Sequence, residues 1–262
     1  MGSNLTTSSS DFELLLIIPA RMGSSRFPGK PLHPINGKPL LQYCVENAQK
    51  AIGADRTWVA TCDQEIVNFS ESIGANVIMT SAQHERASDR VAEAANKIEE
   101  INQVNYDIVI MLQGDEPLIS PKMIVDACKP LLTDTSVKVT NLMAAIDNVE
   151  EFCDVNEVKV VVDLASDAIY FSREQIPSPW KMNVANQMFK QVCCIPFRRD
   201  FLDLFNSLEE TTLERIESID MLRLIEHGYK VRMVPTDEKA YSVDTLSDAK
   251  KVEQYILNSD CN

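Results

Sequence analysis

The sequence has few histidines and, apart from the adjacent Cys193 and Cys194, no closely spaced cysteines. Its three histidines are not at the spacing of metal ligands, and its seven cysteines include no C-x-x-C motif, which argues against a zinc site. We interpret the cysteines as reduced thiols, mostly buried, in a cytoplasmic protein. No apolar run approaches the roughly 18 residues of a membrane-spanning helix. We therefore expect no membrane segment and no membrane partner.

Positive charge is also scarce. Lys and Arg number 25 against 39 Asp and Glu, which gives a net charge of −14. Such a chain has no basic surplus with which to bind nucleic acid, so no nucleic-acid partner is expected. The first residues lack the charged and apolar regions of a signal peptide. We expect a disordered tail over residues 1–12 and a single domain over 13–262, because no linker or internal repeat interrupts the chain.

Apolar runs and helical periodicity alternate through the first half of the chain. This order predicts an α/β fold whose mostly parallel sheet is covered by helices on both faces. The second half predicts a mixed-sheet extension with a loop over 174–188. Strands are predicted at 14–20, 56–62, 76–80, 107–113, 138–146, 158–163, 167–172, 191–197 and 229–235, and helices at 38–51, 64–73, 88–101, 120–132, 199–206, 214–227 and 245–257.

A loop of small residues follows the first predicted strand and carries three cations, Arg21, Arg26 and Lys30. The carboxyl edge of a parallel sheet is where ligands bind, and backbone N–H groups there can approach a phosphate closely. The loop matches neither the Walker A pattern nor the G-x-G-x-x-G fingerprint. We interpret it as a phosphate-binding loop; the alternative is a surface loop with solvated charges.

Two carboxylates follow other apolar segments. Asp115 comes directly after the run at 107–113, within QGDEPLI. A carboxylate that faces a triphosphate needs a divalent cation between them, usually Mg²⁺, although Gly and Asp are also common in β-turns. Asp244, in SVDT, is either a helix N-cap or a second metal ligand, and its position alone favours the cap.

Six segments together carry a resemblance to a known family. PARMGSSRFPGKPL, QGDEPLI, NEVKVVVD, YFSR, LERIES and SVDT resemble, in order and approximate spacing, the bacterial 3-deoxy-manno-octulosonate (Kdo) cytidylyltransferases, from about residue 13 to 256. The resemblance implies a Rossmann-like nucleotidyltransferase fold, a homodimer, and attack of a sugar-acid hydroxyl on the α-phosphorus of CTP. The products would be a CMP-sugar, used for lipopolysaccharide or capsule synthesis, and pyrophosphate.

The resemblance also implies roles for individual residues. The catalytic residues would be Arg21, Lys30, Asp115 and Asp244, and the two aspartates would hold one or two Mg²⁺ ions, which raises Asp244 from cap to ligand or to both. The nucleotide-binding residues would be Ala20, Arg21, Ser24, Ser25, Lys30, Gln113 and Gly114. The sugar-acid site would comprise Arg26, Arg90, Gln113, Gln191, Ile195, Glu214 and Glu217.

The sequence departs from the family pattern mainly on the sugar side. The family's H-x-S-G-T-[DE]-R segment is here HERASDR (84–90), and its H-x-G-I-Y strand is QVCCI (191–195). A lost polar partner can shift specificity, so two alternatives stay open: a Kdo enzyme that has drifted, or a cytidylyltransferase for a modified acid such as 8-amino-Kdo, another small sugar acid or a phosphonate. A nucleotidyltransferase for another base, or a non-catalytic nucleotide-binding homologue, is a further alternative, although retention of Lys30, Asp115 and Asp244 argues against the latter.

Overall fold

The computed structural model describes residues 12–24, 26–181 and 188–259. The chain divides into two compact units, one formed by residues up to Val125 together with Ala240 onward, the other by Asp126–Lys239. The expected tail over 1–12 lies, apart from its last residue, outside the described residues. That 13–262 form a single domain stays a prediction.

The first unit is built on parallel strands in the order β6-β1-β4-β5. Strand β1 (Leu14–Ala20) lies between β4 (Thr57–Thr61) and β6 (Ile108–Leu112), and β5 (Asn76–Met79) pairs with the outer side of β4. Every residue of β6 is buried, as the uninterrupted apolar sequence predicts for a central parallel strand. The predicted parallel sheet is confirmed.

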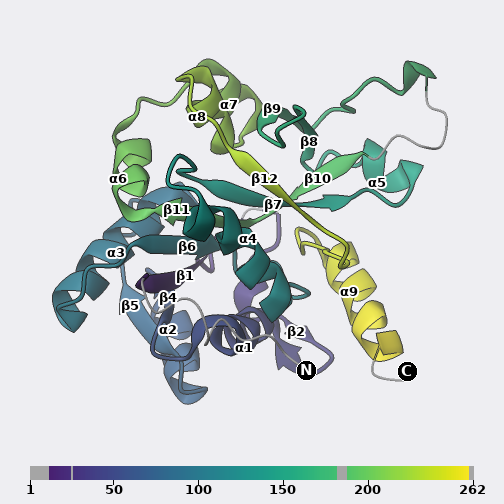
Figure 1. Ribbon diagram of the computed structural model, residues 1–262. Helices are drawn as coiled ribbons and strands as arrows, with labels where there is room; N and C mark the ends of the chain where they lie inside the picture. The colour runs from purple at the N-terminus through teal and green to yellow at the C-terminus, as the bar shows by residue number, and fades with distance from the viewer. Residues whose placement is uncertain (1–11, 25, 182–187, 260–262) are drawn as a thin grey trace. The chain divides into compact units, whose positions relative to one another are not determined.

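Helices α1 (Leu40–Ile52), α2 (Gln64–Ser72) and α3 (Ala87–Asn102) connect these strands. The chain steps outward from β1 to β5 and then returns to β6 on the other side of β1. Right-handed crossovers therefore place α1 and α2 on one face of the sheet, where Figure 1 shows them together, and α3 on the opposite face. The reversal of direction between β1 and β6 is the position at which open α/β sheets bind ligands.

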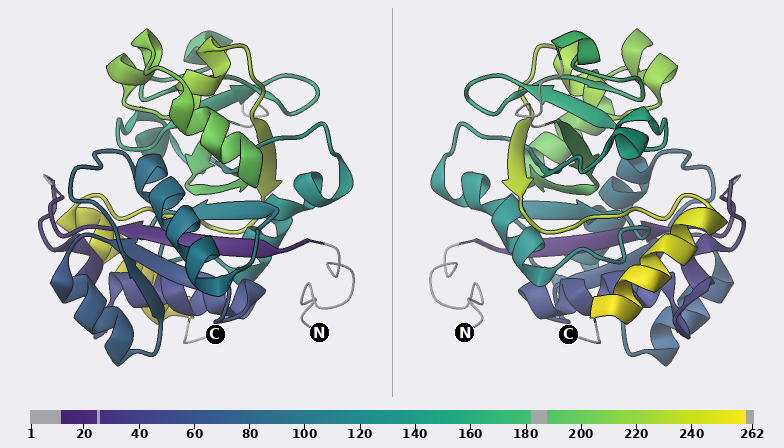
Figure 2. Two further views of the ribbon diagram at one scale, coloured as in Figure 1. Left: turned by 90° about the vertical axis from the view of Figure 1, so that its left-hand side faces the viewer. Right: turned by 90° about the vertical axis from the view of Figure 1, so that its right-hand side faces the viewer.

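The loop between β1 and α1 contains short elements that the sequence did not predict. They are the 3₁₀ turn η2 (Lys30–Leu32) and the hairpin β2 (Pro34–Ile35) and β3 (Lys38–Pro39). The C-terminal helix α9 (Leu246–Ser259) packs on this hairpin, as Figure 2 shows (yellow against purple), and the Asn36 N–H donates to Glu253 at 2.8 Å. The end of the chain thus returns to the loop that follows β1.

The second unit has a mixed sheet in the order β12-β7-β10-β8-β9, which confirms the predicted mixed-sheet extension. Strands β12 and β7 are parallel, and the other pairs are antiparallel. The strands are β7 (Thr140–Ala145), β8 (Lys159–Val162), β9 (Ala168–Ser172), β10 (Phe189–Val192) and β12 (Arg232–Thr236).

Two predicted elements of this half are wrong because the backbone breaks within them. The chain bends at Cys193, so the predicted strand 191–197 is divided between β10 and β11 (Cys194–Arg198). Ser218 is left-handed, with φ of 54°, and divides the predicted helix 214–227. The remaining helical elements are α4 (Pro121–Thr133), α5 (Val149–Cys153), η3 (Pro179–Lys181), α6 (Arg199–Ser207), α7 (Thr212–Glu217) and α8 (Met221–Glu226).

Lys159, in the NEVKVVVD segment, is fully buried in β8. Its ammonium donates to the carbonyl oxygens of Asp154 at 2.8 Å and Glu157 at 2.7 Å, and also to that of Arg173. Burial lowers the pKa of Lys159 below its ordinary value. A buried ammonium needs such partners, so this segment has a structural role in the second unit.

Candidate active site

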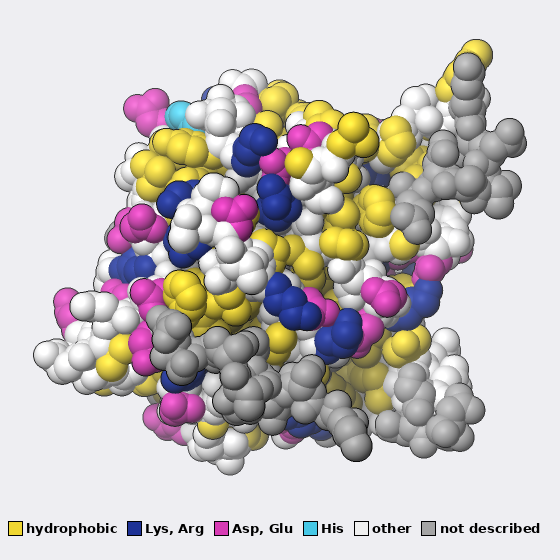
Figure 3. Space-filling view, in the orientation of Figure 1, with side chains coloured by type: hydrophobic (Ala, Val, Ile, Leu, Met, Phe, Trp, Pro, Cys, Tyr) yellow, Lys and Arg dark blue, Asp and Glu magenta, His cyan; other side chains and the backbone are white. Residues whose placement is uncertain are grey.

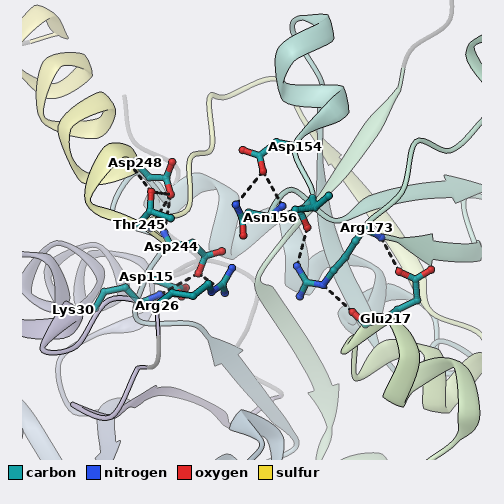
Figure 4. Close-up of polar contacts among 11 residues, drawn as sticks. Arg26, Lys30, Asp115, Asp154, Asn156, Arg173, Glu217, Asp244, Thr245 and Asp248 are labelled. Carbon is teal, nitrogen blue, oxygen red and sulfur yellow. Dashed lines mark hydrogen bonds and ion pairs between the residues drawn. The ribbon is translucent and has the colours of Figure 1, made fainter.

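Two carboxylates and two cations meet in the first unit at the carboxyl edge of its sheet (Figure 4). The Lys30 Nζ lies 2.6 Å from Asp115 Oδ2 and 3.4 Å from Asp244 Oδ1, and Arg26 approaches the same Asp244 oxygen at 2.9 Å. The side chains of Lys30, Asp115 and Asp244 are each less than one fifth exposed, whereas that of Arg26 is 48% exposed. We call these four residues the charged cluster.

Sheet topology explains why distant segments meet there. Lys30 lies in the loop after β1 and Asp115 directly follows Gly114 at the end of β6, and the two strands are parallel neighbours. The segment before α9 is held against Asp115, because the Val243 N–H donates to the Asp115 carbonyl oxygen at 2.9 Å. Backbone pairing therefore positions Asp244 beside Asp115.

The loop after β1 is held in place at several points. The Met22 N–H donates to Asp63 Oδ2 at 2.7 Å, and the Gly29 N–H donates to the Met22 carbonyl oxygen at 3.0 Å. Gly29 has φ of 75°, a left-handed conformation that glycine adopts without a steric cost. This turn precedes Lys30 and directs it back toward the sheet. Asp63 lies two residues after the end of β4, at the same sheet edge.

Lys30 is positively charged over the physiological pH range. Burial alone would lower the pKa of this ammonium, but attraction by Asp115 and Asp244 and its hydrogen bonds with them outweigh burial, so its pKa is raised above the ordinary value.

On the face shown in Figure 3, basic side chains lie singly or in small groups among acidic ones. The paired cations of the charged cluster are therefore a local feature of a strongly acidic chain.

The interpretation of Asp244 as a helix cap is wrong in this structure. The reciprocal hydrogen bonds at the start of α9 belong to its neighbours: the Asp248 N–H donates to Thr245 Oγ1 at 3.3 Å, and Asp248 Oδ2 accepts from the Thr245 N–H at 2.8 Å. The Asp244 carboxylate instead accepts from Arg26 and Lys30. Its side chain is thereby available to the charged cluster.

The donor set of this cluster suits Mg²⁺. Two carboxylates offer hard oxygen ligands, and Mg²⁺ is commonly held by one or two carboxylates together with substrate phosphates and water. Among the described residues, no three His, Cys, Asp or Glu side chains form a complete metal cage. Asp115 and Asp244 therefore fit an ion that takes its remaining ligands from the nucleotide. Metal binding itself stays a prediction.

The other predicted nucleotide residues surround the same strand ends. Ala20 is buried at the end of β1, Arg21 is exposed, and Ser24, Gln113 and Gly114 are half-buried. A Cβ on Gly114 would lie 3.3 Å from Ile18 Cγ2, so glycine allows β6 and β1 to approach closely here. Ser25 lies outside the described residues.

Arg90, predicted to bind the sugar acid, is buried in α3 and holds the neighbouring loop. Its guanidinium donates to Thr80 Oγ1 at 2.5 Å, to the Ser81 carbonyl oxygen at 3.2 Å and to that of His84 at 3.4 Å. The structure thus shows Arg90 supporting segment 80–84 through the Thr80 hydroxyl and two backbone carbonyl oxygens. A sugar contact by Arg90 stays a prediction.

Glu93 fastens the same loop and has an acid-sensitive charge. Its carboxylate accepts from the Ser81 N–H at 2.9 Å and contacts Lys97 Nζ at 2.6 Å and the His84 ring. Burial would raise the pKa of Glu93, but Lys97, the Ser81 N–H and His84 lower it to about 2. Because the folded value lies below the ordinary 4.5, the stability that this carboxylate contributes is complete above pH 4.5 and is lost as the pH falls through 2.

We therefore predict that Glu93→Gln lowers the free energy of unfolding by about 1–2 kcal/mol at pH 7, after allowance for its partial exposure. At pH 3 the loss should be about half as large, since part of the contribution of the wild-type carboxylate has already gone. Urea unfolding at both pH values measures the difference. An equal loss at the two pH values would contradict this account of Glu93.

Four predicted sugar-site residues belong to the second unit, where each has protein partners of its own. Glu214 is fully buried and receives two hydrogen bonds from Arg223, at 2.8 and 2.6 Å. Glu217 accepts from Ser172 Oγ at 2.7 Å. It also accepts from the Arg173 N–H at 2.9 Å (Figure 4). Gln191 donates to the buried Asn141, and Ile195 is a core residue.

Among the described residues, no helix is both long and apolar enough to cross a membrane.

Comparison with known proteins shows the family of this chain. A cytidylyltransferase family model matches residues 15–239. A protein of Geobacter metallireducens named 3-deoxy-manno-octulosonate cytidylyltransferase is 39% identical over 251 residues, covering 92% of this chain and 96% of the relative. A protein of the same name from Solibacter usitatus is 40% identical over 242 residues, covering 92% and 94%.

One solved structure is similar to this chain in both fold and sequence. It is described as CMP:2-keto-3-deoxy-manno-octonic acid synthetase complexed with CTP, and it matches with a TM-score of 0.83 and 35% identity over 94% of this chain and 99% of that one. The α/β nucleotidyltransferase fold expected from the sequence is therefore confirmed. The chain belongs to the cytidylyltransferase family.

Proposed function

We propose that this chain transfers CMP from CTP to Kdo and releases pyrophosphate. The observation that carries the proposal is the charged cluster, which places Lys30 against Asp115 and Asp244 at the sheet edge after β1 and β6. The full-length similarity to proteins named 3-deoxy-manno-octulosonate cytidylyltransferase supports Kdo as the acceptor, and the match to a complex with CTP supports CTP as the donor.

In the proposed reaction, an acceptor hydroxyl oxygen forms a bond to the α-phosphorus of CTP. The bond from that phosphorus to the bridging oxygen of the leaving group breaks, pyrophosphate departs with the electron pair, and the hydroxyl proton passes to solvent. Such transfers depend mainly on positioning and on stabilisation of developing negative charge. We assign Lys30 and Arg21 to the triphosphate, because their loop carries the local positive charge.

Asp115 and Asp244 would hold Mg²⁺, whose chemistry is to neutralise phosphate charge and lower the barrier to displacement. The protein's own contribution is to keep both carboxylates at fixed positions. For Asp115 this follows from the close approach of Gly114 to β1, and for Asp244 from the backbone hydrogen bond between Val243 and Asp115. The number of ions, one or two, is part of the proposal.

We also propose a homodimer that acts in the cytoplasm and supplies activated sugar for lipopolysaccharide or capsule synthesis. The names of the relatives support the link to Kdo chemistry. Size-exclusion chromatography with light scattering tests the dimer. A mass near twice the 29.4 kDa of the chain is expected, and a monomer at working concentration would contradict that part.

A second acceptor is favoured by one observation, the replacement of the family's sugar-side His and Tyr by Gln191 and Ile195. The two acceptors are separated by pyrophosphate release with CTP and Mg²⁺ against Kdo, 8-amino-Kdo, sialic acid and small phosphonates. We expect Kdo to turn over at least as fast as any of the others. Turnover restricted to another acid would replace Kdo as the substrate and leave the CTP chemistry intact.

A further inference from the structure

The charged cluster is electrically balanced without any ligand. Arg26 and Lys30 contribute two positive charges, and Asp115 and Asp244 contribute two negative ones. The Lys30 ammonium bridges oxygens of both carboxylates, at 2.6 and 3.4 Å. The ammonium therefore contacts both of the carboxylates that would hold the metal in the proposed function.

We infer that Lys30 is an exchangeable internal counter-ion, which closes the Asp115–Asp244 pair to divalent cations until a nucleotide triphosphate draws the ammonium away. The inference rests on the proposed function, because the same residues serve the same site. It adds an order of events: metal alone binds weakly, and metal with nucleotide binds well.

The burial of the cluster makes this exchange consequential. The side chains of Lys30, Asp115 and Asp244 are each less than one fifth exposed, so water screens their charges poorly. A buried ammonium without a counter-charge is costly, and hence Lys30 cannot simply swing away. A triphosphate offers replacement anions, and the released carboxylates then accept the cation. Nucleotide and metal each favour the binding of the other by the same factor.

Arg26 is the more exposed of the two cations in the charged cluster. Its side chain is 48% exposed and approaches Asp244 at 2.9 Å. Its removal should therefore open the site less than removal of Lys30. The cluster thus predicts a graded response to loss of positive charge, with the largest effect at the residue that bridges both carboxylates.

The test measures binding of Mn²⁺ alone, as a paramagnetic stand-in for Mg²⁺, to the nucleotide-free full chain by the EPR signal of free Mn²⁺. Lys30→Met removes the charge and keeps the aliphatic stem. It should bind one Mn²⁺ at least about tenfold more tightly than wild type, and Arg26→Met should show a smaller gain. Lys30→Arg retains the charge and should stay within about twofold of wild type.

Two further variants make the result specific. Lys38→Met removes a lysine of the same unit that pairs with Glu46 at 2.8 Å, outside the cluster, and should leave Mn²⁺ affinity unchanged. The double variant Lys30→Met/Asp115→Asn should lose the gain, which shows that the new site uses Asp115. If Lys30→Met does not fold, as judged by thermal unfolding, Lys30→Gln makes the same charge change.

The inference is overturned if folded Lys30→Met or Lys30→Gln binds Mn²⁺ no more tightly than wild type, or if the gain survives in the double variant. Failure of the proposed function is a separate outcome, seen when wild type neither binds CTP with Mg²⁺ nor releases pyrophosphate. The apo metal titration does not depend on turnover, so the two failures are distinguishable.

Discussion

Replacement of Asp115 by Asn should lower kcat by about 100- to 1,000-fold, the usual cost of removing one group that stabilises charge in a transition state. CTP affinity should fall far less, because the phosphate loop and its cations remain. Asp115 is 2.6 Å from Lys30 and is fixed by the backbone after β6. Steady-state pyrophosphate release and equilibrium CTP binding together measure the two effects.

Asp107→Asn is the matched control, because Asp107 precedes the same strand at its opposite end. Its carboxylate accepts from the Glu13 N–H at 2.7 Å, and its replacement should leave kcat within about twofold. A non-catalytic nucleotide-binding protein would show no turnover in wild type, and the loss at Asp115 would then be in CTP affinity alone. That pattern would contradict the proposal that the chain is an enzyme.

Replacement of Glu214 by Gln should lower the free energy of unfolding by about 3–5 kcal/mol, because it leaves a buried guanidinium without its charge partner. The Glu214 side chain is fully buried and that of Arg223 is 7% exposed. Glu214 Oε2 also accepts from the Thr211 N–H at 3.2 Å at the start of α7. Urea denaturation of the wild type and of the variant measures the loss in the free energy of unfolding.

The neighbouring pair of Glu210 and Arg215 is the control, since its charges are 3.9 Å apart and largely solvated. Glu210→Gln should cost less than about 1 kcal/mol. The double variant Glu214→Leu/Arg223→Met should recover much of the loss, because it removes both buried charges. Normal stability of Glu214→Gln with a raised KM for the sugar acid would instead make Glu214 a substrate contact.

The parallel core was predictable because continuous apolar runs form its central strands. The runs at 14–20 and 108–112 are apolar throughout, and polar residues follow Ala20 and Leu112. Such runs predict central parallel strands. Since parallel neighbours end at the same edge, the meeting of Lys30 and Asp115 followed from topology, and the structure places their charges in contact.

The backbone break at Ser218 and the capped helix α5, both in the second half, were harder to predict. Helical periodicity continues across Ser218, and nothing in the residue type signals its left-handed backbone. The helix α5 was missed although Asn148 caps it by accepting from the Glu151 N–H at 2.8 Å. The N-x-x-E spacing at 148–151 is a capping signal that the sequence does contain.

Motifs that carried the family resemblance combine ligand contacts with structural supports, and the sequence alone does not separate the two. Glu214 and Glu217 lie three residues apart in LERIES, yet one forms a buried ion pair with Arg223 and the other binds the end of β9. Their partners are distant in sequence, so tertiary packing decides these contacts. The same holds for Asp63, whose role depends on Met22 across the sheet edge.

The most direct test of the proposed chemistry is phosphorus NMR of wild-type protein mixed with CTP, Mg²⁺ and Kdo. The account predicts that the triphosphate signals are replaced by those of pyrophosphate and of one phosphodiester that joins CMP to the sugar acid. With Asp115→Asn the conversion should be slower by the factor given above. Intact CTP, or hydrolysis to CMP without a phosphodiester, in the presence of Kdo and the other acids of the panel would contradict the assignment of a sugar-acid cytidylyltransferase.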